Sequence, residues 1–264
     1  MMRDLSRCSG EIPHFQRGRS YISLGASFFP HGFCNAPWGV GRLCYNNNQD
    51  DYNFWKDDDS MNVLLVNGSP HRSGCTYTAL SEVAAALKKE GIGAEFFWIG
   101  TKAVHGCTAC GKCRELGKCV FDDDVCNELI ERMQKADGII VGSPVYYGGP
   151  NGALCAVLDR AFYSASATLA NKPAAAVVSC RRGGASASFD RLNKYFTISR
   201  MPVVPSQYWN SVHGNAPGEV RKDLEGLQTM RTLGKNMAWM LKSIQKAKLE
   251  PPRPEPQIAT NFIR

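Results

Sequence analysis

Four cysteines that lie close together are the residues of this chain best suited to chemistry. They are Cys107, Cys110, Cys113 and Cys119, in the spacing C-x2-C-x2-C-x5-C. Three thiolates at this spacing can hold one corner of a cubane cluster, and a fourth further along can complete its ligation. Three basic residues of the same loop, Lys112, Arg114 and Lys118, would offset the negative charge of a cysteine-ligated cluster. The pattern predicts metal or redox chemistry in this loop.

Three other interpretations of these four cysteines stay open. A tetrahedral zinc site with four cysteine ligands is chemically possible, although structural zinc more often uses two separated C-x2-C pairs. Free thiols left from an ancestral cluster are the second interpretation, and a redox-active CxxC without metal is the third. The chain has eleven cysteines, and four that belong to no motif, Cys75, Cys126, Cys155 and Cys180, are expected to be small buried hydrophobic residues.

The stretch Met61–Thr76 is the second feature with chemical potential. A short apolar run, Val63–Val66, breaks at a polar turn and leads into a helical pattern over Tyr77–Lys89. A strand, a tight turn and a helix in this order can bind a phosphate, because free N–H groups and the positive dipole end lie at the helix start. The predicted contacts are Ser69, His71, Arg72, Ser73, Gly74, Cys75 and Thr76. Neither GxxxxGK[ST] nor GxGxxG is present, so an ordinary turn with a serine cap is the alternative.

Two further loops carry residues suited to a flat or anionic ligand. The stretch Gly142–Gly152 is rich in Gly and Pro and holds two tyrosines, which can cover a heterocycle. Its candidate residues are Ser143, Pro144, Val145, Tyr146, Tyr147 and Gly148. The other loop offers Ser179, Arg181, Arg182, Gly183 and Gly184, where arginine can bind an anion and glycine permits close approach. A helix cap with core tyrosines and a solvated pair of arginines are the alternatives.

The elements that position these loops alternate along the chain. The predicted strands are Val63–Val66, Ala94–Ile99, Gly138–Val141, Pro173–Ser179 and Pro202–Val204. The predicted helices are Tyr77–Lys89, Asp124–Lys135, Asn151–Tyr163, Ser188–Ile198 and Glu225–Gln245, with a long loop over Gly100–Cys119. Five strands interleaved with five helices predict a doubly wound parallel sheet in three α/β/α layers. In such a sheet ligands bind at the carboxyl ends of the strands, where the three loops end.

Several of these motifs resemble those of known families. GSPHRSGCT at Gly68–Thr76 is similar to the GSPRxxGNT loop that holds the FMN phosphate in flavodoxin-like NAD(P)H-dependent reductases, with Cys75 in place of the usual Asn. The stretch Ser143–Arg160 resembles the SPVYxGxxxxxLKxxLDR block of NADPH-dependent FMN reductases. The cysteine loop, followed by Cys119–Asp124, resembles that of archaeal and bacterial iron–sulfur flavoproteins. The resemblance covers Met61–Arg182.

The resemblance implies a flavodoxin-like fold with strand order 2-1-3-4-5, FMN bound at the three loops and a [4Fe–4S] cluster on Cys107, Cys110, Cys113 and Cys119. It also implies a homodimer or homotetramer. The expected function is an FMN-dependent oxidoreductase, similar to quinone or flavin reductases, that uses NAD(P)H and relays electrons through the cluster to a small-molecule or protein redox partner. A non-enzymatic electron carrier and a redox- or metal-responsive regulatory flavoprotein without a cluster are the alternatives. We nominate no catalytic acid or base.

Composition limits the remaining possibilities. The chain is 44% hydrophobic and 21% charged, as expected of a globular protein. No apolar run approaches the ~20 residues that cross a bilayer, and the clustered cysteines favour a reducing cytoplasm. Residues 1–60 hold 6 Lys and Arg against 7 Asp and Glu, a net charge of −1. Since the whole chain carries +7, residues 61–264 carry +8. A basic body suits phosphate-bearing ligands, and the absence of nucleic-acid motifs argues against DNA or RNA as a partner.

Three segments are predicted. Residues 1–60 show no sustained period and are expected to be a poorly ordered extension. Residues 61–247 are predicted to form the flavodoxin-like FMN-binding domain, with the cysteine-rich loop at 105–120. Residues 248–264 contain PPRPEPQ and are expected to be a Pro-rich tail.

Overall fold

The computed structural model describes residues 61–256, 258 and 260. The predicted extension at 1–60 and the last residues of the predicted tail lie outside this range. Five parallel strands form the main sheet: β1 (Asn62–Asn67), β2 (Gly93–Trp98), β3 (Gly138–Tyr146), β5 (Ala174–Cys180) and β6 (Ser211–His213). Their order is β2-β1-β3-β5-β6, which is the predicted order once a sixth, two-residue strand is set aside. That strand, β4 (Gly149–Pro150), pairs antiparallel with the end of β3.

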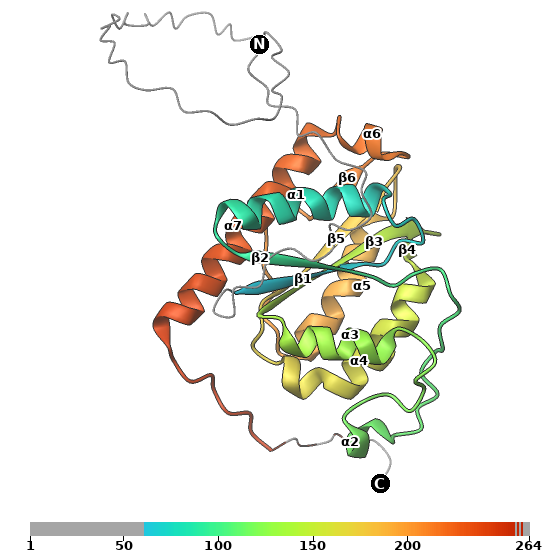
Figure 1. The fold of residues 1–264 in the computed structure, drawn as a ribbon, viewed down its shortest axis with the longest axis vertical. Helices are drawn as coiled ribbons and strands as arrows, with labels where there is room; N and C mark the ends of the chain where they lie inside the picture. Colours follow the sequence, from blue (N-terminus) through green and yellow to red (C-terminus); the bar gives the residue numbers. More distant parts are fainter. Residues whose placement is uncertain (1–60, 257, 259, 261–264) are drawn as a thin grey trace, which may run out of the picture. The chain divides into compact units, whose positions relative to one another are not determined.

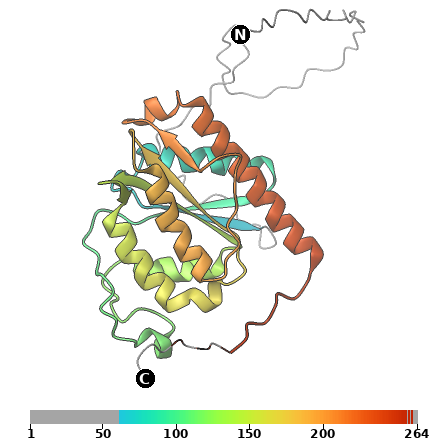
Figure 2. The ribbon, with the colours of Figure 1, turned by 180° about the vertical axis from the view of Figure 1, so that it is seen from behind.

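Helices cover both faces of the sheet (Figures 1 and 2). One face carries α1 (Cys75–Lys89) and α7 (Leu224–Ala247), and the other carries α3 (Cys126–Lys135), α4 (Gly152–Leu169) and α5 (Ala185–Ile198). Two short helices, α2 (Cys113–Leu116) and α6 (Pro217–Val220), lie in loops. The three-layer α/β/α architecture predicted from the alternation of elements is confirmed. Within the described part of the chain, no helix is long and apolar enough to span a membrane.

The continuous apolar strands explain why the sheet is covered on both sides. In β1, Leu64 and Val66 belong to the core under α3, α4 and α5, whereas Val63 and Leu65 belong to the core under α1 and α7. All four side chains are fully buried. Because successive side chains of a strand point to opposite faces, an uninterrupted apolar run requires a protein layer on each face.

The fifth predicted strand, Pro202–Val204, is wrong. Val203 makes only an isolated parallel bridge to Ala174. The strand that completes the sheet is β6, which pairs with Val178–Cys180 of β5. The segment from Pro202 to the end of β6 therefore lies beside β5 and pairs with it at two places, at Val203 and in β6. Two prolines, at 202 and 205, lack the N–H groups that a continuous ladder requires.

The predicted helices all exist, with shifted ends. α1 begins two residues before the predicted start and α5 three residues before it, whereas α3 begins two residues later. α4 runs on to Leu169, beyond the predicted end at Tyr163. α7 ends at Ala247, followed by Lys248 in the left-handed conformation, and residues 249–256 form neither helix nor strand. The two short helices were not predicted, because four residues are too few to show a helical period.

The packing of α7 on α1 depends on Gly234. A Cβ atom at this position would lie 2.6 Å from the Ala86 Cβ and 2.9 Å from the Val83 carbonyl oxygen, both in α1. We therefore expect Gly234→Ala to lower the free energy of unfolding by about 1–3 kcal/mol through overpacking. A urea denaturation curve measures the change.

Gly218→Ala in α6 is the matched control, because a Cβ atom there would meet nothing within 4 Å. Both substitutions replace Gly by Ala in a helix, where Ala is favoured by up to about 1 kcal/mol in the interior. A midpoint for Gly234→Ala as high as that of the control would contradict the close-packing argument.

Candidate functional site

The carboxyl ends of β1, β3 and β5 lie at one edge of the sheet, because these strands are parallel. The loop after β1 folds tightly around Asn67, the last residue of that strand. The Asn67 Oδ1 accepts a hydrogen bond from the Ser69 N–H at 3.1 Å, and its Nδ2 donates to the Arg72 carbonyl at 3.0 Å. The Ser69 Oγ accepts from the His71 N–H at 3.1 Å. A buried amide at the strand end thus fixes the loop that the sequence predicted to bind phosphate.

The start of α1 opens into this loop. Gly74 is its N-cap, and none of the described side chains forms a capping hydrogen bond there. The positive end of the helix dipole is therefore directed at the loop, as an anion site requires. The Thr76 hydroxyl is buried and shares a 2.8 Å hydrogen bond with the Ser179 hydroxyl at the end of β5. This bond joins the first and third predicted loops.

A residue that the sequence analysis gave no role, Asn151, joins the first two loops. It is the N-cap of α4, where its Oδ1 accepts from the Ala153 N–H at 2.9 Å. Its Nδ2 donates to the Gly68 carbonyl at 2.7 Å, across 83 residues of sequence. Its own N–H donates to the Ser143 hydroxyl at 3.0 Å. An Asn before a helix is a recognisable N-cap signal, but the bond to Gly68 could not be inferred from the sequence.

The second predicted loop is a β-hairpin. Tyr146 pairs with Gly149, and the two residues between them, Tyr147 and Gly148, have φ angles of 50° and 77°. Two positive φ angles in a two-residue loop are typical of a type I′ turn, which gives the hairpin the twist of its strands. A bulky residue rarely adopts this conformation. The Tyr147 side chain is fully exposed at the tip, and Tyr146 is exposed by 44%.

The third loop packs against this hairpin. Gly184, with φ of 91°, is so close that an added Cβ would lie 2.7 Å from the Gly148 Cα and 2.8 Å from the Val145 Cγ1. Only glycine fits there. The side chains of Arg181 and Arg182 are exposed. All three predicted loops thus share one edge of the sheet, and a ligand contact for each of their residues stays a prediction.

A fourth loop borders the same edge and was missed. It follows β6, and its Gly214 donates to the Cys180 carbonyl at 2.9 Å. The Gly214 carbonyl lies 3.7 Å from the Cys75 Sγ, which donates to it. Burial raises the pKa of the Cys75 thiol and nearby Glu219 adds to the shift, so this residue is a neutral thiol. The sequence did not reveal this loop, because the predicted fifth strand begins at Pro202, nine residues before β6 begins at Ser211.

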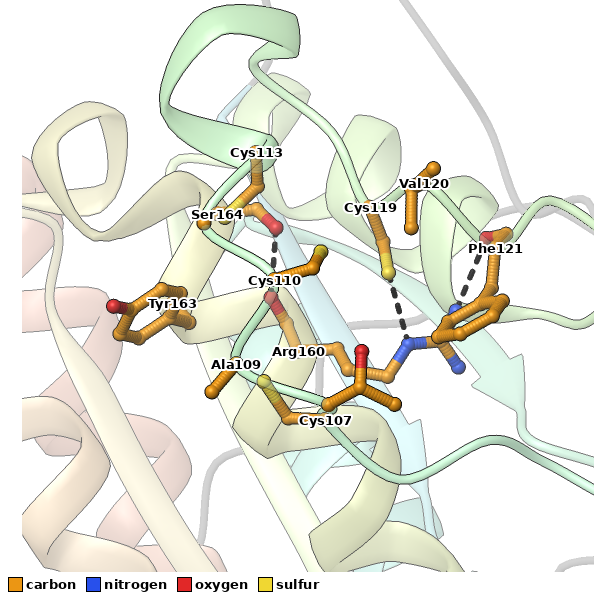
Figure 3. A pocket seen from close by; sticks show the side chains of 12 residues that line it. Cys107, Ala109, Cys110, Cys113, Cys119, Val120, Phe121, Arg160, Tyr163 and Ser164 are labelled. Carbon is orange, nitrogen blue, oxygen red and sulfur yellow. Dashed lines mark hydrogen bonds between the residues drawn. The ribbon is translucent and has the colours of Figure 1, made fainter.

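The four clustered cysteines line a single pocket against α4, which we call the cysteine hollow (Figure 3). Other residues of its lining include Phe121, Arg160, Tyr163 and Ser164. Cys107 and Cys110 are exposed, Cys119 is half-buried and Cys113 is buried at the start of α2. Among residues 61–256, 258 and 260, no three His, Cys, Asp or Glu side chains are close enough to hold a metal ion. The four predicted cysteine ligands thus line one pocket, but their sulfur atoms do not converge on one point.

The floor of the cysteine hollow is the buried guanidinium of Arg160, whose side chain is 1% exposed. Its Nη1 lies 2.5 Å from the Asp124 Oδ2 and also donates to the His105 carbonyl at 3.2 Å. Its Nη2 donates to the Phe121 carbonyl at 3.1 Å, and its Nε lies 3.1 Å from the Cys119 Sγ (Figure 3). In the sequence, this residue is prominent only as the end of the LDR motif. An arginine on the apolar face of a predicted helix, downstream of an acidic run, was the available signal.

Asn127 holds the backbone of the same cysteine. Its Oδ1 accepts from the Cys119 N–H at 2.9 Å, and its Nδ2 donates to the Cys119 carbonyl at 3.1 Å. The same Nδ2 lies within 3.1 Å of the Phe121 carbonyl and 2.8 Å of the Asp122 Oδ1. Cys119 is therefore fixed through both its backbone and its side chain, unlike the exposed Cys107 and Cys110.

The charges beneath the hollow are set by burial and hydrogen bonding. Burial by itself raises the pKa of Asp124, but hydrogen bonds from Arg160 and from the N–H groups of His105 and Cys126 outweigh it, so the pKa lies below its usual value. The pair is therefore an ionised carboxylate and a guanidinium. Burial raises the pKa of the Cys126 thiol to about 12. Burial also raises the pKa values of Cys155 and Cys180. Cys126 and Cys180 are buried, as predicted, whereas Cys75 and Cys155 are half-buried.

Comparisons with known proteins match the described domain. A family model for NADPH-dependent FMN reductases matches residues 61–216. An iron–sulfur flavoprotein of Methanocaldococcus jannaschii is 38% identical over 194 residues, which cover 70% of this chain and all of the relative. An iron–sulfur flavoprotein of Methanosarcina thermophila is 32% identical over 191 residues, covering 70% of this chain and 98% of the relative. The resemblance found in the sequence is confirmed.

Two solved structures share the fold. A crystal structure of RosB, with a bound 8-demethyl-8-formylriboflavin-5′-phosphate intermediate, has a TM-score of 0.58 at 15% identity and covers 78% of this chain and 96% of its own. A flavone reductase has a TM-score of 0.56 at 18% identity and covers 72% of this chain and 66% of its own. At such identities these likenesses show the fold alone. Together with the strand order, they confirm the flavodoxin-like fold class.

The buried pair beneath the hollow yields a prediction about stability. Asp124→Asn leaves the Arg160 charge buried without its counter-ion. We therefore expect the free energy of unfolding at pH 7 to fall by about 3–5 kcal/mol. Because the folded-state pKa of Asp124 is lowered, its contribution is present above the unfolded pKa of about 3.9 and is lost as pH falls through the lower folded value. The difference in free energy of unfolding between wild type and Asp124→Asn should therefore decrease below about pH 4.

Urea denaturation at a series of pH values from 7 to 3 measures this gap. Arg132→Met is the control, because Arg132 is exposed by 44% and its ion pair with Glu95 lies at the surface, where a pair contributes about 0–1 kcal/mol. A gap that stays constant between pH 7 and pH 3 would show that the ionised carboxylate is not what stabilises the fold.

Proposed function

Because this chain belongs to the NADPH-dependent FMN reductase family, and thereby to the FMN-dependent oxidoreductases, we propose that it takes electrons from NAD(P)H and relays them through a [4Fe–4S] cluster. The electrons pass to a small-molecule or protein redox partner. The observation that carries the proposal is that the four cysteines line one hollow while three glycine-rich loops share the carboxyl edge of the sheet. The iron–sulfur flavoproteins that resemble this chain support the cluster.

The residues of the sheet edge fit the phosphate end of FMN. The start of α1 has no side-chain cap among the described residues, and an anion would complete it. Gly68 lets the loop pack closely against β3 and α4, since a Cβ there would lie 2.4 Å from the Leu154 Cδ2 and 2.8 Å from the Gly142 carbonyl. Exposed Ser73 and Arg72 border the loop. We assign the phosphate to Ser69–Thr76.

The other loops fit the ring end. FMN supplies an isoalloxazine ring that exchanges electrons in pairs or singly. The Tyr146 and Tyr147 rings at the hairpin can cover one face of a flat heterocycle, and their exposure leaves them accessible. Arg181 or Arg182 can hold negative charge on the reduced ring, because both extend from the neighbouring loop. None of these residues is assigned a proton-transfer role.

The cysteine hollow fits a thiolate-ligated cluster in the chemistry of its donors. Cys107, Cys110, Cys113 and Cys119 all line it, and Arg160 places a buried positive charge beside them. A cysteine-ligated cluster is negatively charged, so this cation would stabilise it. Zinc could use the same four donors, and an assay of bound metal separates the two.

Self-association is part of the proposal. Tyr208 and Trp209 are exposed by 61% and 55%, and Trp239 of α7 by 68%. The segment before Tyr208 is held against α7, since the Asn236 Nδ2 donates to the Pro205 carbonyl at 2.8 Å. Exposed aromatic side chains on adjoining segments are typical of protein interfaces. They support a homodimer or homotetramer, which analytical ultracentrifugation would detect.

A second candidate function is a regulatory flavoprotein whose cysteines respond to metal or oxidation. It is favoured by the separation of the cysteine sulfurs, since no three metal-binding side chains converge in the described part of the chain. It is also favoured by the exposure of Cys107 and Cys110. A non-enzymatic electron carrier would use the same loops without reacting with pyridine nucleotides.

Anaerobic purification, followed by an absorption spectrum and metal assays, tests the cluster. We expect FMN bands and about four iron atoms per chain, as a cubane requires. Cys107→Ser should lose the iron and keep the FMN, because Cys107 is exposed and its loss leaves the core intact. Cys155→Ser, the control outside the hollow, should keep both. FMN with zinc, or FMN without any metal in wild type, would reject the relay.

Anaerobic addition of NADH or NADPH tests the donor in the same samples. Bleaching of the flavin bands within about a second, the time of a typical enzymatic turnover, supports a function as an NAD(P)H-dependent enzyme. A flavin that dithionite reduces but neither nucleotide reduces would point to the carrier.

A charge in the phosphate loop tests the FMN site. Ser73 is exposed in the loop, so Ser73→Glu should not disturb folding. Its carboxylate would repel the phosphate, and we expect FMN affinity to fall at least tenfold, about 1.4 kcal/mol. Riboflavin, which lacks the phosphate, should bind equally to variant and wild type. Ser243→Glu near the exposed end of α7 is the control. The neighbouring Lys242 contacts Glu90, which follows the last residue of α1, so this position lies at the end of α1 opposite the phosphate loop. Fluorescence titration of the apoprotein measures both ligands, and an equal loss of riboflavin affinity would contradict the assignment.

A further inference from the structure

Arg160 has a charged side chain that is only 1% exposed, and the side chain of its partner Asp124 is 3% exposed. Burying a guanidinium is costly unless its charge is paired and its N–H groups are bonded. The Asp124 carboxylate supplies the counter-charge. Two backbone carbonyls, of His105 and Phe121, accept further hydrogen bonds. These three partners fix the plane of the guanidinium, so the direction of its Nε–H group is fixed as well.

Of the two remaining N–H groups, Nε–H is directed at the Cys119 Sγ at 3.1 Å (Figure 3). Among the described residues, Cys119 is the one cysteine of the four whose sulfur accepts a hydrogen bond from a buried cation, and Cys107 and Cys110 are exposed. Asn127 holds the Cys119 backbone at the same time. One cysteine of the four is therefore distinguished by a buried cation and a fixed conformation.

We propose that Arg160 is a positioning residue that holds Cys119 as a ligand and raises the reduction potential of the cluster through its hydrogen bond to the Cys119 sulfur. The inference rests on the cluster of the proposed function. Hydrogen bonds to ligand sulfurs and the net charge of the site are among the quantities that set the potential of an iron–sulfur cluster. Because Asp124 neutralises Arg160, the hydrogen bond is the contribution that remains. It favours the form with the additional electron, and burial strengthens it because the local dielectric constant is low.

Charge and hydrogen bond can be separated because Arg160 is paired with Asp124. Arg160→Met/Asp124→Asn removes one positive and one negative charge together, so the net charge beneath the hollow is unchanged while the donor to Cys119 is lost. This double variant also avoids leaving a buried charge without a partner, which would destabilise the fold. The amide that the double variant carries at position 124 keeps an oxygen that can accept from the His105 or Cys126 N–H, the two backbone partners of Asp124.

Two single variants serve as controls. Asp124→Asn keeps the Arg160 donor and loses the same ion pair, so it reveals what loss of the pair does by itself. Arg132→Met removes a positive charge from an exposed position, where solvent and salt screen its effect on the cluster. All variants are measured as the anaerobically reconstituted full chain, at a temperature at which circular dichroism shows each to be folded.

The experiment is a reductive titration followed by electron paramagnetic resonance, with iron content measured on each sample. For the double variant we expect the ratio of reduced to oxidised cluster at a given applied potential to fall at least tenfold, a shift of about 59 mV for one electron. Asp124→Asn should show an unchanged or higher ratio, and Arg132→Met an unchanged one. Loss of iron confined to the double variant would equally support the assignment, since Asp124→Asn lacks the same ion pair.

A double variant that keeps its iron and titrates with wild type would overturn the inference and leave the proposed function standing. So would an equal downward shift in Asp124→Asn, because the effect would then follow from the loss of local stability. Wild-type protein that takes up no iron on reconstitution would reject the cluster itself, and the inference with it.

Discussion

Parallel pairing of β1, β3 and β5 is the constraint on which the rest of the structure depends. Their side chains are buried on both faces, so helices must cover each face of the sheet. Each connection must return from the carboxyl end of one strand to the amino end of the next. The carboxyl ends of the strands consequently meet at a single edge. Loops that are distant in sequence become neighbours there, although no motif encodes their contact.

Buried polar side chains convert this proximity into a defined site. Asn67 closes the first loop on itself, and Asn151 ties it to the second by the bond to the Gly68 carbonyl. The Thr76 and Ser179 hydroxyls join the first loop to the third. Each of these groups would be costly to bury without a partner, so the loops are fixed relative to one another. Preorganisation of this kind lowers the conformational cost of binding a ligand such as FMN.

The cysteine hollow is organised on the same principle, with a charge in place of the amides. Arg160 and Asp124 satisfy each other in the interior, and their remaining hydrogen bonds hold His105, Phe121 and Cys119. The loop is thus fixed at its fourth cysteine and open at its first two. The NADPH-dependent FMN reductase family supplies the flavodoxin-like frame, and this loop adds four clustered cysteines to it.

The sequence by itself determined the fold class, the three loops that follow β1, β3 and β5, and the cysteine group, because these depend on local signals: apolar runs, turn residues and spacing. It misplaced one strand, since a three-residue edge strand carries too little periodicity to separate Pro202–Val204 from Ser211–His213. Only the tertiary structure revealed the roles of Asn151 and Arg160, whose partners lie 83 and 36–55 residues away in sequence. Such pairings depend on which elements the fold brings together, and burial decides them only after the layers have packed.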